Sequence, residues 1–206
     1  MPQLEFEQQL YLITRSPFSK ADWHTIEAAI CGGVGIVQLR DKEARDDELM
    51  AISESLLSLL EPYNVPLVIN DRLAVARATG AHLHLGLNDG CPIHAREVLG
   101  PDAIIGLTIH QWPQLAEKYK DVINYVGCGP VFNTETKADA LASFGVETLK
   151  GLCKDSPVPV VAIGGISEDN IHSVWAAKPF AVAVCSAIFN SSSPQKSAEM
   201  LRPNRH

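Results

Sequence analysis

Polar side chains that can bind phosphate stand in several short groups along this chain, and the first group contains three of them. Gln38, Arg40 and Lys42 alternate with other residues, so in an extended strand they would lie on the same face. An amide and two cations on one face form a clamp for an anion. The alternative is a solvated strand end in which Lys42 pairs with Glu43 or Asp46, because exposed charges are common after strands.

Two aspartates, Asp71 and Asp89, could hold a divalent cation. Each follows an apolar segment, and neighbouring strand ends would bring the two carboxylates together. Mg²⁺ is typically held by one or two carboxylates plus substrate phosphates, so this pair facing the cations predicts a site for Mg²⁺ and a diphosphate. The simpler alternatives are an N-cap role for Asp71 at the next helix and, for Asp89, a plain Asn-Asp-Gly turn.

The most distinctive segment, Gly129 to Lys137, reads Gly-Pro-Val-Phe-Asn-Thr-Glu-Thr-Lys. The hydroxyls of Thr134 and Thr136, together with the ammonium of Lys137, can wrap a phosphate or a diphosphate. A hydroxyl-rich turn in a solvent loop is the alternative interpretation.

A second candidate phosphate site combines two further places in the chain. Gly164 and Gly165 end an apolar segment, and a helical turn is expected to open at Cys185 and Ser186. Glycines let backbone N–H groups approach a ligand closely, and the start of a helix presents amides that point outward. The alternative for the glycines is an ordinary tight turn between a strand and a helix.

The histidines and cysteines show no comparable pattern. His82 and His84 lie two residues apart, but no third metal ligand has a suitable spacing, so we interpret them as structural. Cys128 and Cys185 have no neighbouring histidine in the sequence and are interpreted as small buried thiols rather than nucleophiles. The chain has five cysteines without a CxxC pair, so neither a disulfide framework nor a zinc site is indicated.

The apolar segments that precede these groups predict eight strands, because they are short and bounded by turn residues. They span Leu10–Thr14, Gly35–Arg40, Pro66–Asn70, His82–Leu85, Ile104–Thr108, Asn124–Gly127, Pro159–Ile163 and Phe180–Cys185. Amphipathic segments predict a helix after each strand, at Trp23–Cys31, Asp46–Leu60, Leu73–Ala78, Ile93–Leu99, Pro113–Tyr119, Val146–Lys154, Asn170–Ala176 and Pro194–Leu201.

This alternation of strands and helices predicts an α/β fold with a parallel sheet. Strands such as Pro159–Ile163 are apolar on both faces, as expected where helices cover the sheet. Eight such units in roughly 200 residues match a single-domain (β/α)8 TIM barrel over residues 1–206. A doubly wound open sheet is the alternative, but the polar groups follow the strands, and barrel chemistry sits at the carboxyl ends of strands.

Composition excludes several other classes of protein. The chain has 206 residues, of which 46% are hydrophobic and 20% charged, so it is globular rather than disordered. The net charge of −7 disfavours a nucleic-acid partner. The longest mostly apolar segment, Ala181 to Phe189, is shorter than the roughly 20 residues of a membrane-spanning helix, and the N-terminus has no signal pattern. We expect a cytoplasmic protein with no membrane partner.

Taken in chain order, these groups resemble the thiamine-phosphate synthase family, and the resemblance runs from about Leu10 to Ile188. The family's Q-L-R-x-K, I-N-D and H-x-G-x-x-D stand here at Gln38–Lys42, Ile69–Asp71 and His84–Asp89. Its G-P-x-F-x-T-x-T-K, I-G-G-I and S-A-I stand at Gly129–Lys137, Ile163–Ile166 and Ser186–Ile188. Six motifs in order, each after a predicted strand, make the resemblance specific.

The resemblance implies a (β/α)8 barrel that binds two small-molecule substrates and Mg²⁺. The Gln38–Lys42 segment, which includes Leu39 and Asp41, would bind the aminopyrimidine diphosphate together with Asn70, Thr108 and Lys137. Asp71 and Asp89 would hold Mg²⁺. The thiazole phosphate would be bound by Thr134, Glu135, Thr136, Gly165, Cys185 and Ser186.

The family's chemistry implies that the diphosphate leaves first. The ring amine stabilises the resulting pyrimidine-methyl cation, and the thiazole nitrogen attacks it to give thiamine phosphate. Arg40, Lys42, Thr108 and Lys137 would be the catalytic residues, and the segment 137–144 is expected to act as a lid. The alternatives are a thiazole tautomerase of the same fold and a non-catalytic phosphate-binding protein, and a homo-oligomer is compatible with either activity.

Overall fold

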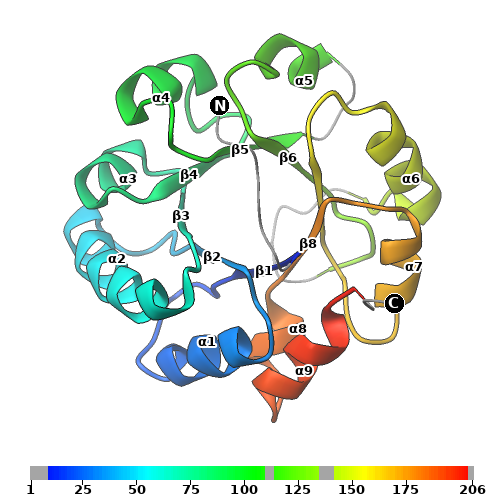
Figure 1. Cartoon of the computed structure of the whole chain (residues 1–206), viewed down its shortest axis with the longest axis horizontal. Coiled ribbons are helices and arrows are strands. Elements are labelled where there is room, and N and C mark those ends of the chain that lie inside the picture. The colour runs from blue at the N-terminus through cyan, green and yellow to red at the C-terminus, as the bar shows by residue number, and fades with distance from the viewer. Residues whose placement is uncertain (1–8, 110–113, 135–141, 204–206) are drawn as a thin grey trace.

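Eight parallel strands form a closed barrel in the computed structural model, which describes residues 9–109, 114–134 and 142–203 (Figure 1). The strands are β1 (Leu10–Ile13), β2 (Ile36–Leu39), β3 (Leu67–Asn70), β4 (His82–Leu85), β5 (Ile105–Ile109), β6 (Tyr125–Cys128), β7 (Val160–Ile163) and β8 (Ala181–Val184). Each strand pairs with the next, and β8 pairs with β1 in the register Leu10↔Val182 and Leu12↔Val184. The expectation of a closed barrel is confirmed, and the doubly wound sheet is excluded.

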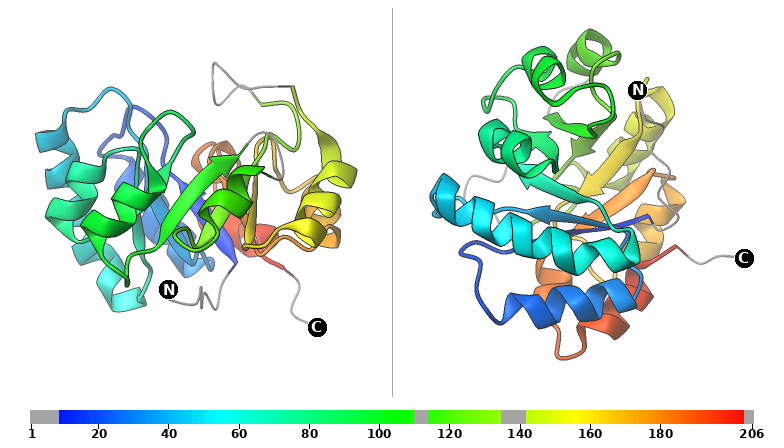
Figure 2. Two further views of the ribbon diagram at one scale, coloured as in Figure 1. Left: turned by 90° about the horizontal axis from the view of Figure 1, so that it is seen from above. Right: turned by 60° about the vertical axis from the view of Figure 1, so that its left-hand side comes forward.

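The helices form an outer ring around the strands (Figures 1 and 2). They are α1 (Asp22–Cys31), α2 (Asp46–Leu60), α3 (Leu73–Thr79), α4 (Pro92–Leu99), α5 (Gln114–Tyr119), α6 (Gly145–Asp155), α7 (Ile171–Ala176), α8 (Ser186–Phe189) and α9 (Pro194–Leu201). The expected strands and helices are all present, with ends that differ by at most one residue. The short 3-10 helix at Glu61–Tyr63, which follows α2 directly, was not expected.

Two separate apolar layers hold the barrel together. Outward-facing strand residues such as Leu12, Leu39 and Ile69 pack against the helices. Inward-facing residues such as Tyr11, Val68 and Val161 fill the barrel itself. Successive side chains of a strand point to opposite faces, so a strand that is buried on both sides is apolar throughout. This explains why polar and apolar residues do not alternate in β7.

The closed sheet brings the carboxyl ends of all eight strands to one mouth, where the polar groups of the sequence follow the strands. Within the described ranges, no helix combines the length and the apolarity needed to cross a membrane.

Candidate active site

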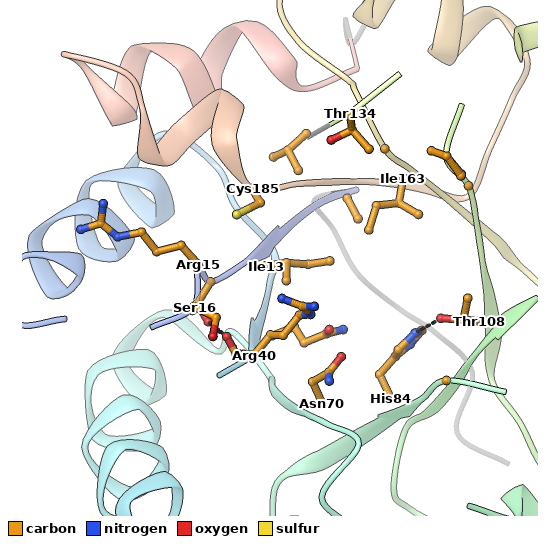
Figure 3. A pocket seen from close by; sticks show the side chains of 18 of the residues that line it. Ile13, Arg15, Ser16, Arg40, Asn70, His84, Thr108, Thr134, Ile163 and Cys185 are labelled. Carbon is orange, nitrogen blue, oxygen red and sulfur yellow. Dashed lines mark hydrogen bonds between the residues drawn. The ribbon is translucent and has the colours of Figure 1, made fainter. Parts of the chain in front are cut away.

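A cavity of about 530 Å³ lies at the mouth of the barrel and is lined by residues from the ends of the strands (Figure 3). Most of the residues that the sequence predicted for the site line this cavity. They are Gln38, Arg40, Lys42, Asn70, Asp71, Asp89, Thr108, Thr134, Gly165, Cys185 and Ser186. The predicted residues Glu135, Thr136 and Lys137, and most of the expected lid at 137–144, lie outside the described residues.

Leu39 and Asp41 do not line the cavity, although they belong to the predicted binding segment. The Leu39 side chain points outward and is buried against the helices. The carboxylate of Asp41 accepts hydrogen bonds from the Ser16 hydroxyl at 2.9 Å and from the backbone N–H of Phe18 at 2.8 Å. Strand alternation and the loop after β1 direct these two side chains away from the cavity, and a role of Leu39 and Asp41 in binding substrate stays a prediction.

The alternating residues Gln38, Arg40 and Lys42 all reach the cavity, as their spacing predicts. The backbone after β2 is fixed by the loop after β1. The Arg40 N–H donates to the Thr14 hydroxyl at 2.9 Å, and the Lys42 N–H donates to the Ser16 hydroxyl at 3.1 Å. This support holds two cationic side chains at the mouth.

The proposed pairing of Lys42 with Asp46 is not found. Asp46 pairs instead with Arg72 at 2.9 Å, and among the described residues no ion pair involves Lys42. Burial raises the pKa of Asp71, and the charge of Lys42 is among the influences that oppose this rise. Lys42 is thus an exposed residue after β2 that also lines the cavity, so the structure agrees with a solvated strand end as well as with a role in the site.

Asp71 is held by its backbone in a conformation that aims it at Asp89. Its φ of 64° lies in the left-handed region, and its N–H donates to the carbonyl of His84 at 2.8 Å. The N-cap residue of α3 is Arg72, and the structure shows no side-chain cap there, so Asp71 does not cap that helix. Asp89 does close a turn, since its N–H donates to the Gly86 carbonyl at 3.3 Å.

The two carboxylates influence each other strongly. Burial, followed by the charge of Asp89 and a hydrogen bond with it, raises the pKa of Asp71, and the Gly86 N–H and Lys42 oppose this. A methyl group at Gly86 would collide with Oδ2 of Asp89 and would lie 4.0 Å from Oδ1 of Asp71. The missing side chain at Gly86 thus leaves the space in which the two carboxylates meet.

This donor set fits Mg²⁺ bound together with a phosphate ligand. Hard oxygen donors are the ligands that Mg²⁺ prefers, and one or two carboxylates with substrate phosphates are typical. In the part of the chain that the structure describes, no group of three or more His, Cys, Asp or Glu side chains could hold a metal ion. The remaining ligands would have to come from the substrate and from water.

The second candidate phosphate region depends on glycines after β7. Gly164 and Gly165 have φ values of 98° and 65°, and a methyl group at Gly165 would stand 2.5 Å from the Asn133 carbonyl oxygen. The Gly129–Thr134 loop lies against this turn, since the Val131 N–H donates to the Ile163 carbonyl at 3.0 Å. Only glycine combines this conformation with this approach. Close by in the cavity, the short helix α8 begins at Ser186.

Figure 3 shows two polar regions on opposite sides of the cavity. Thr134 and Cys185 lie on one side, and Asn70, His84 and Thr108 lie on the other. The apolar side chains of Ile13 and Ile163 lie between them. The site can therefore hold two polar groups with an apolar surface between them.

The cysteine thiols are poor nucleophiles here. Burial, with a further contribution from Cys153, raises the pKa of Cys128 to about 12. Burial also raises the pKa of Cys185 to about 11, although the nearby cations Arg40 and Arg15 oppose it. Both thiols are protonated near neutral pH, as their interpretation as buried thiols requires.

Sequence reasoning missed several residues that line the cavity, above all His84. His84 hydrogen-bonds Thr108 through Nε2 at 2.8 Å and Tyr125 through Nδ1 at 3.0 Å. His84 therefore has the structural role that the sequence analysis gave it, but its side chain also lines the cavity. The signal was its position near the end of β4, on the inward face that a closed barrel directs to the mouth. Four residues within or directly after β1 were also missed, namely Ile13, Thr14, Arg15 and Ser16.

The chain is similar to known proteins over most of its length. Residues 10–188 match the family model described as thiamine monophosphate synthase. A thiamine-phosphate synthase of Azorhizobium caulinodans is 40% identical over 200 residues, which cover 96% of this chain and 94% of the relative. That of Psychrobacter sp. is 41% identical, with 95% and 94% covered. A solved thiamine phosphate pyrophosphorylase from Pyrococcus furiosus superposes with a TM-score of 0.84 at 31% identity, with 95% and 94% covered.

Proposed function

This chain belongs to the thiamine monophosphate synthase family and is a transferase that forms thiamine phosphate, and from this premise we propose how its residues act. The observation that carries the proposal is the division of one cavity into two regions. Asn70, which precedes Asp71 in the chain, stands on one side with Thr108, and Thr134 stands on the other side with Cys185, which precedes Ser186. One region suits a diphosphate with its cation, and the other suits a monophosphate.

The diphosphate of the aminopyrimidine substrate is bound by Arg40 and Lys42, with Asn70 and Thr108 beside them. Negative charge gathers on a diphosphate as its bond to carbon breaks, so fixed cations stabilise the departing group more than the bound substrate. The proposal includes Lys137, on the basis of the family motif. It is supported by the placement of Thr134, three residues before it, in the lining of the cavity.

Asp71 and Asp89 are the residues that would hold Mg²⁺. When bound there, the ion supplies further neutralisation of the diphosphate charge. Lys42, whose charge also acts on Asp71, lines the same cavity. The mutual repulsion of the two carboxylates favours binding of a cation, because burial and Asp89 both disfavour the charged form of Asp71 without one.

The thiazole phosphate is bound on the opposite side, by Thr134 and by backbone N–H groups of Gly165, Cys185 and Ser186. The left-handed turn at Gly165 and the start of α8 both lie in the lining of the cavity, where backbone N–H groups can face a ligand. The proposal extends to Glu135 and Thr136 through the family motif. The two substrates would then meet over the apolar surface of Ile13 and Ile163.

No protein nucleophile is needed for this reaction. The cavity holds both substrates at once, and fixing two reactants in contact can lower a barrier by roughly 7–11 kcal/mol in well-oriented cases. The apolar side chains of Ile13 and Ile163 keep water from the reacting carbon, where a pyrimidine-methyl cation would otherwise be captured by water. The ring amine of the substrate supplies the electrons that stabilise this cation.

The test is turnover of the purified protein with aminopyrimidine diphosphate and thiazole phosphate, with Mg²⁺ and with a chelator. We expect thiamine phosphate and pyrophosphate in equal amounts, and only with the metal. Product formation that is unaffected by the chelator would contradict the metal site. Binding of thiazole phosphate without any product would instead support a tautomerase or a phosphate-binding protein.

A further inference from the structure

Five side chains form a continuous hydrogen-bonded chain through the interior of the barrel, below the cavity. Gln38 Nε2 donates to the Tyr11 hydroxyl at 2.7 Å, and that hydroxyl lies 2.8 Å from the Tyr125 hydroxyl. The Tyr125 hydroxyl lies 3.0 Å from His84 Nδ1, and His84 Nε2 lies 2.8 Å from the Thr108 hydroxyl. The two ends, Gln38 and Thr108, line the cavity, whereas both tyrosines are fully buried beneath it.

The barrel makes room for these rings with glycines on the neighbouring strands. A methyl group at Gly106 on β5 would collide with the Tyr125 ring and would lie 2.5 Å from His84 Nδ1. A methyl group at Gly127 on β6 would lie 3.2 Å from His84 Cε1. The His84 and Tyr125 rings are stacked, with centroids 5.5 Å apart. The packing therefore fixes the positions of the His84 and Tyr125 rings.

Gln38 donates to the Tyr11 hydroxyl, and either tyrosine hydroxyl could donate to the other. If every hydroxyl hydrogen in the series is used between these side chains, Tyr11 donates to Tyr125 and Tyr125 donates to His84 Nδ1. A neutral imidazole that accepts at Nδ1 carries its hydrogen at Nε2, and it donates that hydrogen to Thr108. The Thr108 hydroxyl hydrogen and the Gln38 carbonyl oxygen are both left for the cavity.

We propose that this chain of hydrogen bonds is a positioning device that presents an acceptor at Gln38 and a donor at Thr108, and thereby selects a 4-aminopyrimidine over its 4-oxo analogue. The exocyclic amine gives its hydrogen to the Gln38 carbonyl oxygen, and a ring nitrogen accepts from Thr108. The oxo analogue presents the reverse pattern, a carbonyl oxygen and a ring N–H. His84, Tyr125 and Tyr11 are positioning residues, and Figure 3 shows His84 joined to Thr108 at the edge of the cavity.

This inference rests on the proposed binding of the aminopyrimidine half by Gln38 and Thr108. Sites built to hydrogen-bond a substrate reject analogues that lack the matching group, because buried polar groups are then left unpaired. If each of these hydrogen bonds pointed the other way, from Thr108 toward Gln38, the site would present a donor at Gln38 and an acceptor at Thr108 and would select the oxo analogue. The direction of the hydrogen bonds is therefore the property to measure.

The first measurement is ¹⁵N NMR of the histidine rings in the wild-type protein, with the His84 signals identified by their loss in His84→Gln. We expect the His84 ring to carry its hydrogen at Nε2 and to lack one at Nδ1. A hydrogen at Nδ1 alone, or at both nitrogens, would overturn the proposal. This result does not depend on turnover, so it separates failure of the inference from failure of the proposed function.

The second measurement compares the amino and oxo substrates in Tyr11→Phe and Tyr125→Phe. Removal of either hydroxyl allows the Gln38 amide to turn over and present its N–H to the cavity. We therefore expect the preference for the amino substrate over the oxo substrate to fall by about tenfold or more, mainly through a higher KM for the amino substrate. The KM for thiazole phosphate should not change. Tyr63→Phe, which removes an exposed hydroxyl outside the site, is the matched control. An unchanged preference in folded Tyr11→Phe protein would overturn the proposal even if Tyr125→Phe failed to fold.

Discussion

Single residues at the mouth of the barrel serve the site at the expense of stability. Asp71 is the clearest example, because burial and the neighbouring Asp89 raise its pKa. A carboxyl group with a raised pKa favours the folded state when protonated, and that contribution is lost as the pH rises through its ionisation. Near neutral pH, the ionised Asp71 therefore opposes folding until a cation is bound.

We predict that Asp71→Asn lowers turnover by about a hundredfold or more while the melting temperature without Mg²⁺ stays the same or rises. Asparagine accepts the left-handed backbone at φ 64°, so the fold should tolerate the change. The measurement is turnover with Mg²⁺ beside thermal unfolding in a chelator. Near-normal turnover, or a clear loss of stability without metal, would contradict the assignment.

His84 gives a second prediction at this scale, concerning acid stability. Burial lowers its pKa from 6.5 to about 4, so between these values the unfolded chain binds a proton that the folded protein does not. Stability therefore falls as the pH is lowered through this range, by about 3 kcal/mol at about 1.4 kcal/mol per pKa unit. Denaturant unfolding between pH 7 and pH 4 should show a smaller loss in His84→Gln. Equal losses in both proteins would contradict the buried, neutral state of His84.

At the scale of the element, the turn after β7 is the feature that positions the second phosphate region. Its two glycines adopt left-handed conformations, and the Gly129–Thr134 loop packs directly on them. A side chain at Gly165 would push this loop away, and the loop carries Thr134 into the cavity. The geometry of the turn and the binding of phosphate are therefore coupled.

We predict that Gly165→Ala raises the KM for thiazole phosphate by about tenfold and destabilises the protein by roughly 1–3 kcal/mol. The KM for the aminopyrimidine diphosphate should change much less. Gly151→Ala is the matched control, because Gly151 lies within α6 with nothing within 4 Å of the added methyl group. That change should stabilise the helix by up to about 1 kcal/mol. Equal effects of both variants on thiazole-phosphate binding would contradict the prediction.

At the scale of the whole molecule, the two ends of the barrel serve different purposes. The site lies at the carboxyl ends of the strands, whereas the opposite end holds the ring of helices together. There Gly32, after α1, lets α9 approach so closely that a methyl group would lie 2.7 Å from Ala198 Cβ. The Trp175 ring N–H of α7 donates to the Leu201 carbonyl of α9 at 3.0 Å. Helix α9 thus joins the first and last parts of the ring.

We predict that Gly32→Ala lowers the melting temperature without changing kcat at a temperature where the variant is folded. Overpacking of this kind costs typically about 1–3 kcal/mol, and each kcal/mol corresponds to roughly 2–4 °C in a protein of this size. Gly32 does not line the cavity, so the chemistry should be preserved. A loss of kcat in fully folded protein would show that the two ends are coupled.

Local sequence determined most of the elements and the residues that gather at the mouth. Strands such as β7 and helices such as α2 are specified by patterns within a few residues, and these patterns placed their ends correctly to within one residue. The alternation of Gln38, Arg40 and Lys42 likewise follows from the two-residue period of a strand, and all three reach the cavity. The resemblance of the motifs to those of the family identified the expected substrates.

The tertiary structure decided what depends on contacts between distant parts of the chain. Closure of the sheet requires β8 to pair with β1, and the hydrogen bond between Tyr11 and Tyr125 joins residues 114 positions apart. The hydrogen bonds that occupy Asp41 and the route by which His84 reaches the cavity are equally non-local. A motif specifies residue types, but the direction of a side chain depends on neighbours that only the closed barrel brings together.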